Sequence, residues 1–192
     1  ARASYGENDY SSSSGTVNDI PQYEGEIRAI GGVAPTERGF IQPYYGIGAR
    51  FLYDNNKGHS STTGALGYDR RIAQFYAPIG LWYQNKGGYF DISSKAEFDI
   101  PLFGIVESRL QNAVGAGESN IVNHQRIFEG YGLRGEIMLG KTLGKYTLQA
   151  GPFIRYWHYG DSDTAPSSIP GYVFWEPEND RLQAGAQIKV LW

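Results

Sequence analysis

A regular alternation of apolar and polar residues runs through most of this chain, and it restricts the fold more than any other feature. Residues 89–100 show it most clearly, with Phe90, Ile92, Ala96, Phe98 and Ile100 alternating with Asp91, Ser93, Lys95, Glu97 and Asp99. Successive side chains of a β-strand point to opposite faces, so the pattern predicts strands with one apolar and one polar face. It does so in residues 23–33, 41–54, 71–83, 89–100, 130–139, 146–159 and 182–192.

The connections between these segments alternate in length. Short, turn-like connections occur at 33–40, 84–88 and 140–145, and longer polar ones at 10–22, 55–67, 101–120 and 160–171. An up-and-down meander has this pattern when one end of a barrel is trimmed and the other carries loops. A weaker alternation in residues 1–6 supplies an eighth strand, in keeping with the even strand numbers of bacterial membrane barrels. We therefore expect one all-β domain, 1–192, folded as an antiparallel up-and-down barrel of eight strands.

Composition excludes several classes of protein. The chain has 192 residues, 26 glycines, 15% aromatic residues and a net charge of −3, without a cluster of Lys and Arg that would suit nucleic acid. It has no cysteine, which removes disulfides and thiolate chemistry. No apolar run reaches the ~20 residues of a transmembrane helix. No signal peptide is visible, so we expect that one was removed or never existed.

Three features favour a barrel that turns its apolar face to lipid. The apolar face extends over ~9–11 positions per strand, the length of a tilted transmembrane strand. The polar face carries glycines and charges of both signs, which we expect to fill the interior as a paired network: Glu24, Glu26, Arg28, Arg50, Lys95, Glu97, Asp99, Arg134, Glu136, Arg155 and Lys189. Aromatic residues gather near strand ends, as in interfacial girdles: Tyr44, Tyr45, Trp82, Tyr83, Tyr89, Phe90, Trp157, Tyr159, Phe174, Trp175 and Trp192.

A water-soluble barrel of the lipocalin or avidin type is the alternative architecture. It would bury Phe98, Ile137 and Ile188 around a ligand cavity and turn the charged face to water. The alternating loop lengths and the terminal aromatic residue favour the membrane-spanning version.

The last residues, 186–192 (AQIKVLW), carry a resemblance to a known class of protein. They resemble the closing strand of bacterial outer-membrane β-barrels, which ends in an aromatic residue, usually Phe and here Trp. The layout of the whole chain is similar to the small eight-stranded barrels of the OmpA, OmpX and NspA class. The resemblance implies a bacterial outer-membrane location, contact with membrane lipid and lipopolysaccharide, and an assembly signal of Ile188, Val190 and Trp192 for the barrel-assembly machinery.

Candidate chemical groups are few. His59, His124 and His158 lie in or near the predicted long loops, and some small outer-membrane barrels are proteases or lipid-modifying enzymes. No spacing here defines a nucleophile and its base, so we expect no catalytic residue, metal or cofactor. Arg70 and Arg71 suit either lipopolysaccharide phosphates or an ion pair between strands.

The expected function is therefore that of a barrel with a plugged polar interior and a structural or interaction role, with a protein partner at its long loops. A narrow solute channel and a lipid-modifying or proteolytic enzyme are the alternatives within the membrane class.

Overall fold

The computed structural model describes residues 1–12, 15–32, 38–85, 89–114, 120–168 and 170–191. Within these residues the chain forms one antiparallel sheet of eight consecutive long strands, and the predicted all-β, up-and-down arrangement is confirmed. The strands are β1 (Arg2–Ser12), β2 (Gly15–Gly32), β3 (Arg38–Asp54), β4 (Arg70–Asn85), β5 (Asp91–Ser108), β7 (Gly130–Leu143), β8 (Tyr146–Tyr159) and β11 (Asn179–Leu191).

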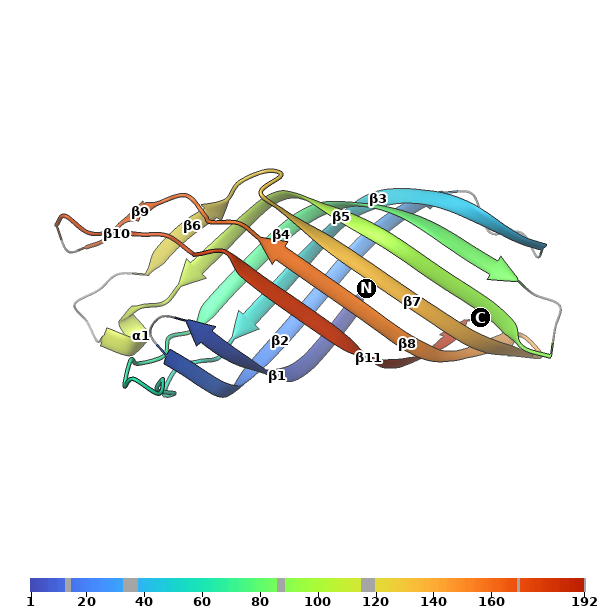
Figure 1. The fold of residues 1–192 in the computed structure, drawn as a ribbon, viewed down its shortest axis with the longest axis horizontal. Coiled ribbons are helices and arrows are strands. Elements are labelled where there is room, and N and C mark those ends of the chain that lie inside the picture. The colour runs from blue at the N-terminus through green and yellow to red at the C-terminus, as the bar shows by residue number, and fades with distance from the viewer. Residues whose placement is uncertain (13–14, 33–37, 86–88, 115–119, 169, 192) are drawn as a thin grey trace.

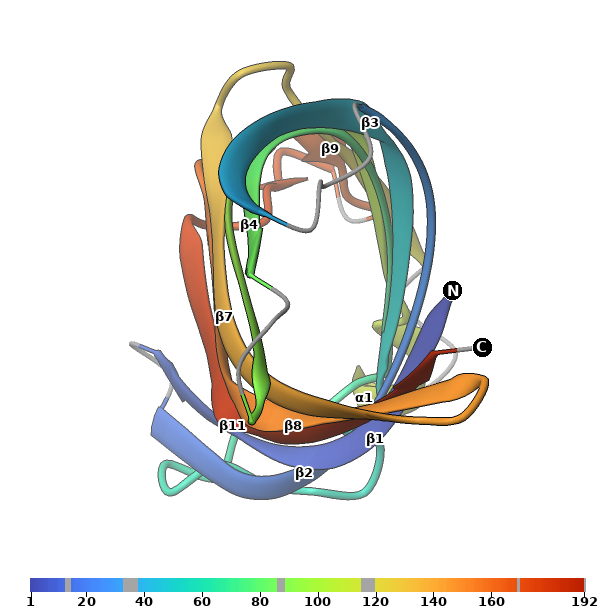
Figure 2. The same cartoon turned by 90° about the vertical axis from the view of Figure 1, so that its right-hand side faces the viewer.

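The sheet curls into a half-barrel with a concave interior, and its strands cross the long axis of the molecule obliquely (Figures 1 and 2). Four short elements lie at the end that carries the long loops: α1 (Gln111–Val114), β6 (Ile121–Gln125), β9 (Ala165–Pro166) and β10 (Val173–Phe174). β6 extends the sheet beside β5, and β9 and β10 form a separate hairpin. None of the described helices has the length and apolar character needed to cross a membrane.

The predicted turn 140–145 is too long, because β7 continues to Leu143. Two predicted long loops, 10–22 and 101–120, are wrong in part, because β-bulges break the period of two there. Residues 10–12 and 15–22 belong to β1 and β2, where the register shifts near Asp19, a residue with a φ of 55°. Residues 101–108 continue β5, and Leu102 has no partner between the pairs of Pro101 and Phe103 with β4. An inserted residue exchanges the two faces of a strand, so the alternation no longer reads as continuous. The predicted connections 33–40 and 84–88 fall mostly outside the described residues.

Burial is inverted relative to a water-soluble barrel. Asp99 and Arg50 are 0% and 1% exposed, whereas Ile47 and Ile188 are 65% and 74% exposed. Phe98 and Ile137, which a soluble barrel would bury, are also exposed, so this alternative is wrong about these residues. The charged face of the sheet therefore lines the interior, and the apolar face is turned outward.

The outward face carries a continuous apolar row that crosses six of the eight long strands, from β3 to β11. Each residue of this row is the direct cross-strand partner of the next: Tyr45, Ile79, Phe98, Leu133, Tyr156 and Leu182, from β3, β4, β5, β7, β8 and β11. All but the half-buried Tyr156 are exposed. Such a row is far larger than the scattered apolar residues of an ordinary protein surface.

Several aromatic residues predicted for the outer girdles lie inside instead. Tyr44, Trp157 and Tyr159 are buried in the interior, and Trp82 lines an interior cavity. Their positions have the same parity as the inward polar residues of their strands, and this parity overrides their proximity to a strand end. The exposed aromatic residues of the predicted girdles are Tyr45, Tyr89, Phe90 and Trp175.

Candidate functional site

A charged network fills much of the concave interior, and Arg134 on β7 is its most connected member. The Arg134 Nε atom lies 2.5 Å from Asp99 Oδ2 and 3.2 Å from Glu97 Oε1. Its Nη1 atom donates to Glu26 Oε2 at 2.9 Å. One guanidinium thus pairs with three carboxylates from two other strands, and pairing is the condition under which buried charges are tolerated.

Glu24 is a second centre of the network, and it joins both ends of the sheet. It accepts a hydrogen bond from Arg50 Nη2 at 3.1 Å and one from Gln183 Nε2 at 2.8 Å, and it forms an ion pair with Arg2. These partners come from β3, β11 and β1 respectively. The polar interior therefore holds strands that are distant in the chain close together.

The end of the interior nearest the short connections holds a third group of charges. Lys189 donates to Glu136 Oε1 at 2.5 Å, and Lys95 lies 3.9 Å from the same oxygen atom. On the other side, Arg28 forms an ion pair with Glu97, whose Oε2 atom also accepts a hydrogen bond from Tyr44 at 2.7 Å. Two lysines share one carboxylate here, so positive charge is in excess.

A layer of large side chains crosses the middle of the interior. Tyr76 packs edge-on against Trp157 with ring centroids 5.1 Å apart, and Trp157 stacks on Tyr159 at 5.6 Å. The Arg50 guanidinium lies over the Trp157 ring at 5.1 Å. Side chains normally fill the interior of an eight-stranded barrel, and this layer does so with almost no exposed atoms.

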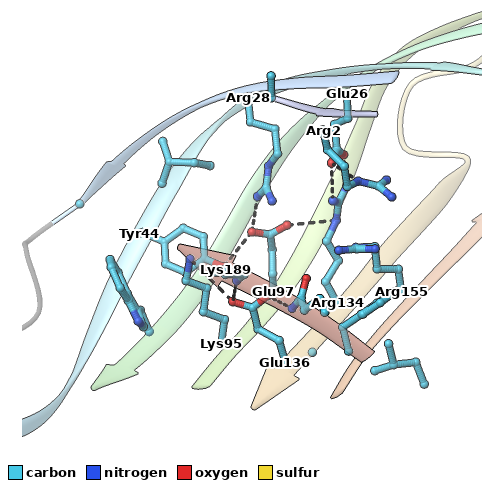
Figure 3. A pocket seen from close by; sticks show the side chains of 18 of the residues that line it. Arg2, Glu26, Arg28, Tyr44, Lys95, Glu97, Arg134, Glu136, Arg155 and Lys189 are labelled. Atoms are coloured by element: carbon cyan, nitrogen blue, oxygen red, sulfur yellow. Dashed lines mark hydrogen bonds and ion pairs between the residues drawn. The ribbon is translucent and has the colours of Figure 1, made fainter. Parts of the chain in front are cut away.

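Beside this layer, toward the short connections, the network surrounds a cavity of about 730 Å³ (Figure 3). Arg2, Arg134 and Arg155 line one part of it, and Lys95 and Lys189 line another. We call this space the interior cavity. Two buried donors in its walls, Arg28 Nε and Trp82 Nε1, make no hydrogen bond among the described residues. One buried acceptor, Glu97 Oε1, also makes none, but it lies 3.2 Å from Arg134 Nε in an ion pair.

Of the eleven residues predicted for the interior network, ten form ion pairs with one another or with Arg2. Arg155 is the exception, and no carboxylate lies within ion-pair distance of it in the described part of the chain. Sequence reasoning missed Arg2, Tyr44, Tyr76 and Trp157. For Tyr44 and Trp157 the parity of the strand was the available signal, since they share a strand face with Arg50 and Arg155. Arg2 and Tyr76 lie on β1 and β4, which carry no predicted network residue.

At the loop end, a separate group of charges closes the interior. Arg70 pairs with Asp54 at 3.1 Å and also with Glu176, and Arg181 lies 3.7 Å from Asp54. Both arginines thus form the interstrand ion pairs considered from sequence: Arg70 with Asp54, and the more exposed Arg71 with Glu107 at 3.8 Å. Tyr68 precedes this group in the loop, and burial, with the Glu176 carboxylate, raises its pKa.

The loop of residues 160–178 is fastened to β6. The Asn123 side chain donates to the carbonyl oxygens of Asp163 and Phe174, at 2.9 and 3.1 Å. The Asp163 carboxylate accepts from the backbone of His124 at 2.6 Å. Both arms of the β9–β10 hairpin are therefore held in place.

The histidines do not form one site. His124 Nδ1 lies 3.2 Å from Asp163, and His158 Nδ1 lies 2.9 Å from Asp180, while His59 belongs to the loop between β3 and β4. Among the described residues, no group of three acidic or histidine side chains is placed to hold a metal ion.

In the predicted assembly signal, Ile188 and Val190 are exposed on β11, and Trp192 lies outside the described residues. No protein-family model matches the chain, and no curated protein matches it.

Proposed function

We propose that this protein is an integral outer-membrane β-barrel with a plugged interior, whose loops serve a structural or interaction role. The single observation that carries the proposal is the inverted burial, with charged side chains inside and aliphatic and aromatic side chains outside. Apolar surface exposed to water costs about 25 cal/mol per Å², so an outward row from Tyr45 to Leu182 is unfavourable in water. In a bilayer the same row faces hydrocarbon and the cost disappears.

The backbone arrangement also supports a membrane location. The curled antiparallel sheet hydrogen-bonds each strand to its neighbours from β1 to β11, and pairing of these two edge strands with each other would give the edgeless barrel that lipid requires. The proposed surroundings are the lipid and lipopolysaccharide of a bacterial outer membrane, and the barrel-assembly machinery would insert the chain using Ile188, Val190 and Trp192. Exposed Ile188 and Val190 fit this role, since both point outward.

The layer formed by Tyr76, Trp157 and Tyr159 argues for a plugged interior rather than a narrow channel. All three rings are buried, and they pack against each other and against Arg50. An ion or small solute could cross the interior only if all three rings moved aside.

The loop end supports the interaction role. The β9–β10 hairpin is held by Asn123, and Asp69 fixes the loop between β3 and β4 by accepting from the Lys57 backbone at 3.0 Å. Because these loops are already ordered, they lose little conformational entropy when a partner protein binds.

Vesicle flotation with matched variants tests the proposal. The refolded chain is mixed with lipid vesicles, centrifuged through a density gradient, and assayed for β-rich circular dichroism and heat-modifiable gel mobility. We expect it to float with the vesicles and to give a silent planar bilayer. Ile79→Arg should reduce insertion, since Arg on the lipid face costs about 2–4 kcal/mol at the midplane. Leu66→Arg, at an exposed loop position, is the control and should insert normally.

A chain that stays monomeric in plain buffer and does not float would overturn the membrane location. Single-channel currents abolished by enlarging the Tyr76 layer would overturn the plugged interior.

A further inference from the structure

The interior carries more positive than negative charge, although the whole chain has a net charge of −3. Its basic members are Arg2, Arg28, Arg50, Lys95, Arg134, Arg155 and Lys189, and its acidic members are Glu24, Glu26, Glu97, Asp99 and Glu136. Charges in a largely buried interior are stabilised by pairing, so an excess of two cations favours the binding of an anion there.

Arg155 carries one of these two excess charges, and the other belongs to the two lysines that share Glu136. Arg155 is the direct cross-strand partner of Arg134, and like charges in this relationship are destabilising. Arg134 has three carboxylate partners, whereas Arg155 has none among the described residues, and its guanidinium carbon lies 4.0 Å from the centroid of the Phe153 ring. Figure 3 shows Arg155 beside Arg134 at the edge of the interior cavity, away from the Lys189–Glu136 pair.

The cavity also contains donors that have no acceptor. Arg28 Nε and Trp82 Nε1 are buried and make no hydrogen bond among the described residues, and both residues line the cavity. A buried donor without a partner costs free energy, and a ligand that supplies acceptors removes this cost. Unpaired positive charge and unpaired donors therefore point to the same kind of ligand.

We propose that the interior cavity binds a small phosphate-type oxyanion, with the Arg155 guanidinium as its main ligand and Arg2 beside it. A guanidinium presents two parallel N–H groups that match two oxygens of phosphate. The cavity, at about 730 Å³, is large enough for phosphate and several waters, each of which occupies about 30 Å³ in the liquid. This inference concerns the interior alone and goes beyond the proposed membrane role.

Titration with inorganic phosphate tests the site. The full chain is refolded in a nonionic detergent and phosphate-free buffer, and binding is followed by isothermal titration calorimetry and tryptophan fluorescence, because Trp82 lines the cavity. We expect saturable binding, weakened roughly tenfold or more in Arg155→Gln, as for the loss of a charge-assisted hydrogen bond. Arg155→Lys keeps the positive charge but loses the paired N–H donors of the guanidinium, so its affinity for phosphate should be intermediate.

Lys145→Gln is the matched control, since it removes one positive charge at an exposed position in the β7–β8 turn. It should bind phosphate as the unmodified chain does. Arg155 has no ion-pair partner within the described part of the chain, so Arg155→Gln should still fold. Circular dichroism and heat-modifiable mobility verify this. Titrations with glycerol phosphate and with short-chain phosphatidic acid distinguish a soluble phosphate ester from a lipid headgroup.

Two outcomes overturn the site: absence of saturable phosphate binding by the folded chain, or equal binding by Arg155→Gln. Neither affects the membrane proposal, which depends on flotation and not on phosphate.

Discussion

The ring of Tyr76 lies against the backbone of Gly48, its direct cross-strand partner, with no room for a side chain between them. A Cβ atom added at Gly48 would be 2.3 Å from Tyr76 Cζ. Tyr44 and Gly80 repeat this relationship one layer away, on the same two strands. Glycine on the concave face thus provides the space in which the interior tyrosines lie.

Gly48→Ala should therefore destabilise the fold by about 1–3 kcal/mol, the usual cost of overpacking a filled interior. Urea unfolding of the refolded protein, followed by tryptophan fluorescence, measures the change. Gly25→Ala is the control, because a Cβ atom at Gly25 meets nothing within 4 Å. Equal stability of the two variants would show that Tyr76 moves aside at no cost.

Arg134→Met should be more damaging. It removes the shared partner of Glu26 and Asp99 and leaves both carboxylates buried, at an expected cost of about 3–5 kcal/mol. Arg126→Met breaks an exposed pair with Glu129 and should cost less than about 1 kcal/mol. The Arg134 side chain is 8% exposed and the Arg126 side chain 63%, so burial separates the two cases. Similar unfolding midpoints for both variants would contradict this interpretation of the network.

Asn123→Ala should loosen the β9–β10 hairpin without unfolding the sheet. The substitution removes the donor to the Asp163 and Phe174 carbonyls, so we expect amide hydrogen exchange in residues 161–168 and 170–175 to speed up roughly tenfold. Asn179→Ala serves as the control, since the Asn179 side chain donates a long hydrogen bond, at 3.4 Å, to the nearby carbonyl oxygen of Pro177. Unchanged exchange in the hairpin would mean that other contacts hold it.

The fold was predictable from sequence wherever the period of two is unbroken. Ile47 and Arg50 fall on opposite faces as their parity requires, and they lie outside and inside in the structure. The pattern failed at Asp19 and Leu102, because a single inserted residue reverses the faces and hides the strand. The position of a bulge depends on the neighbouring strand, which a one-dimensional pattern does not contain.

The residue types of the interior were also predictable, but their pairings were not. Glu26 and Arg134 are 108 residues apart, and only the curvature of the sheet brings them together. For the same reason the isolation of Arg155 cannot be read from sequence, where it is one arginine among several inward charges. Aromatic residues near strand ends were misassigned because parity, not proximity to an end, decides whether Tyr44 and Trp157 point inward.

The position of Glu24 has a consequence for the order of folding. Its carboxylate is bound by Arg2 and Arg50 from neighbouring strands, but also by Gln183, 159 residues later in the chain. The contacts of Glu24 with Arg2 and Arg50 can form early in folding, whereas the contact with Gln183 can form only after β11 is in place. Closing so long a loop is slow compared with making hairpins. β11 therefore completes the polar interior, and the sheet reaches full stability only after this strand has been added to it.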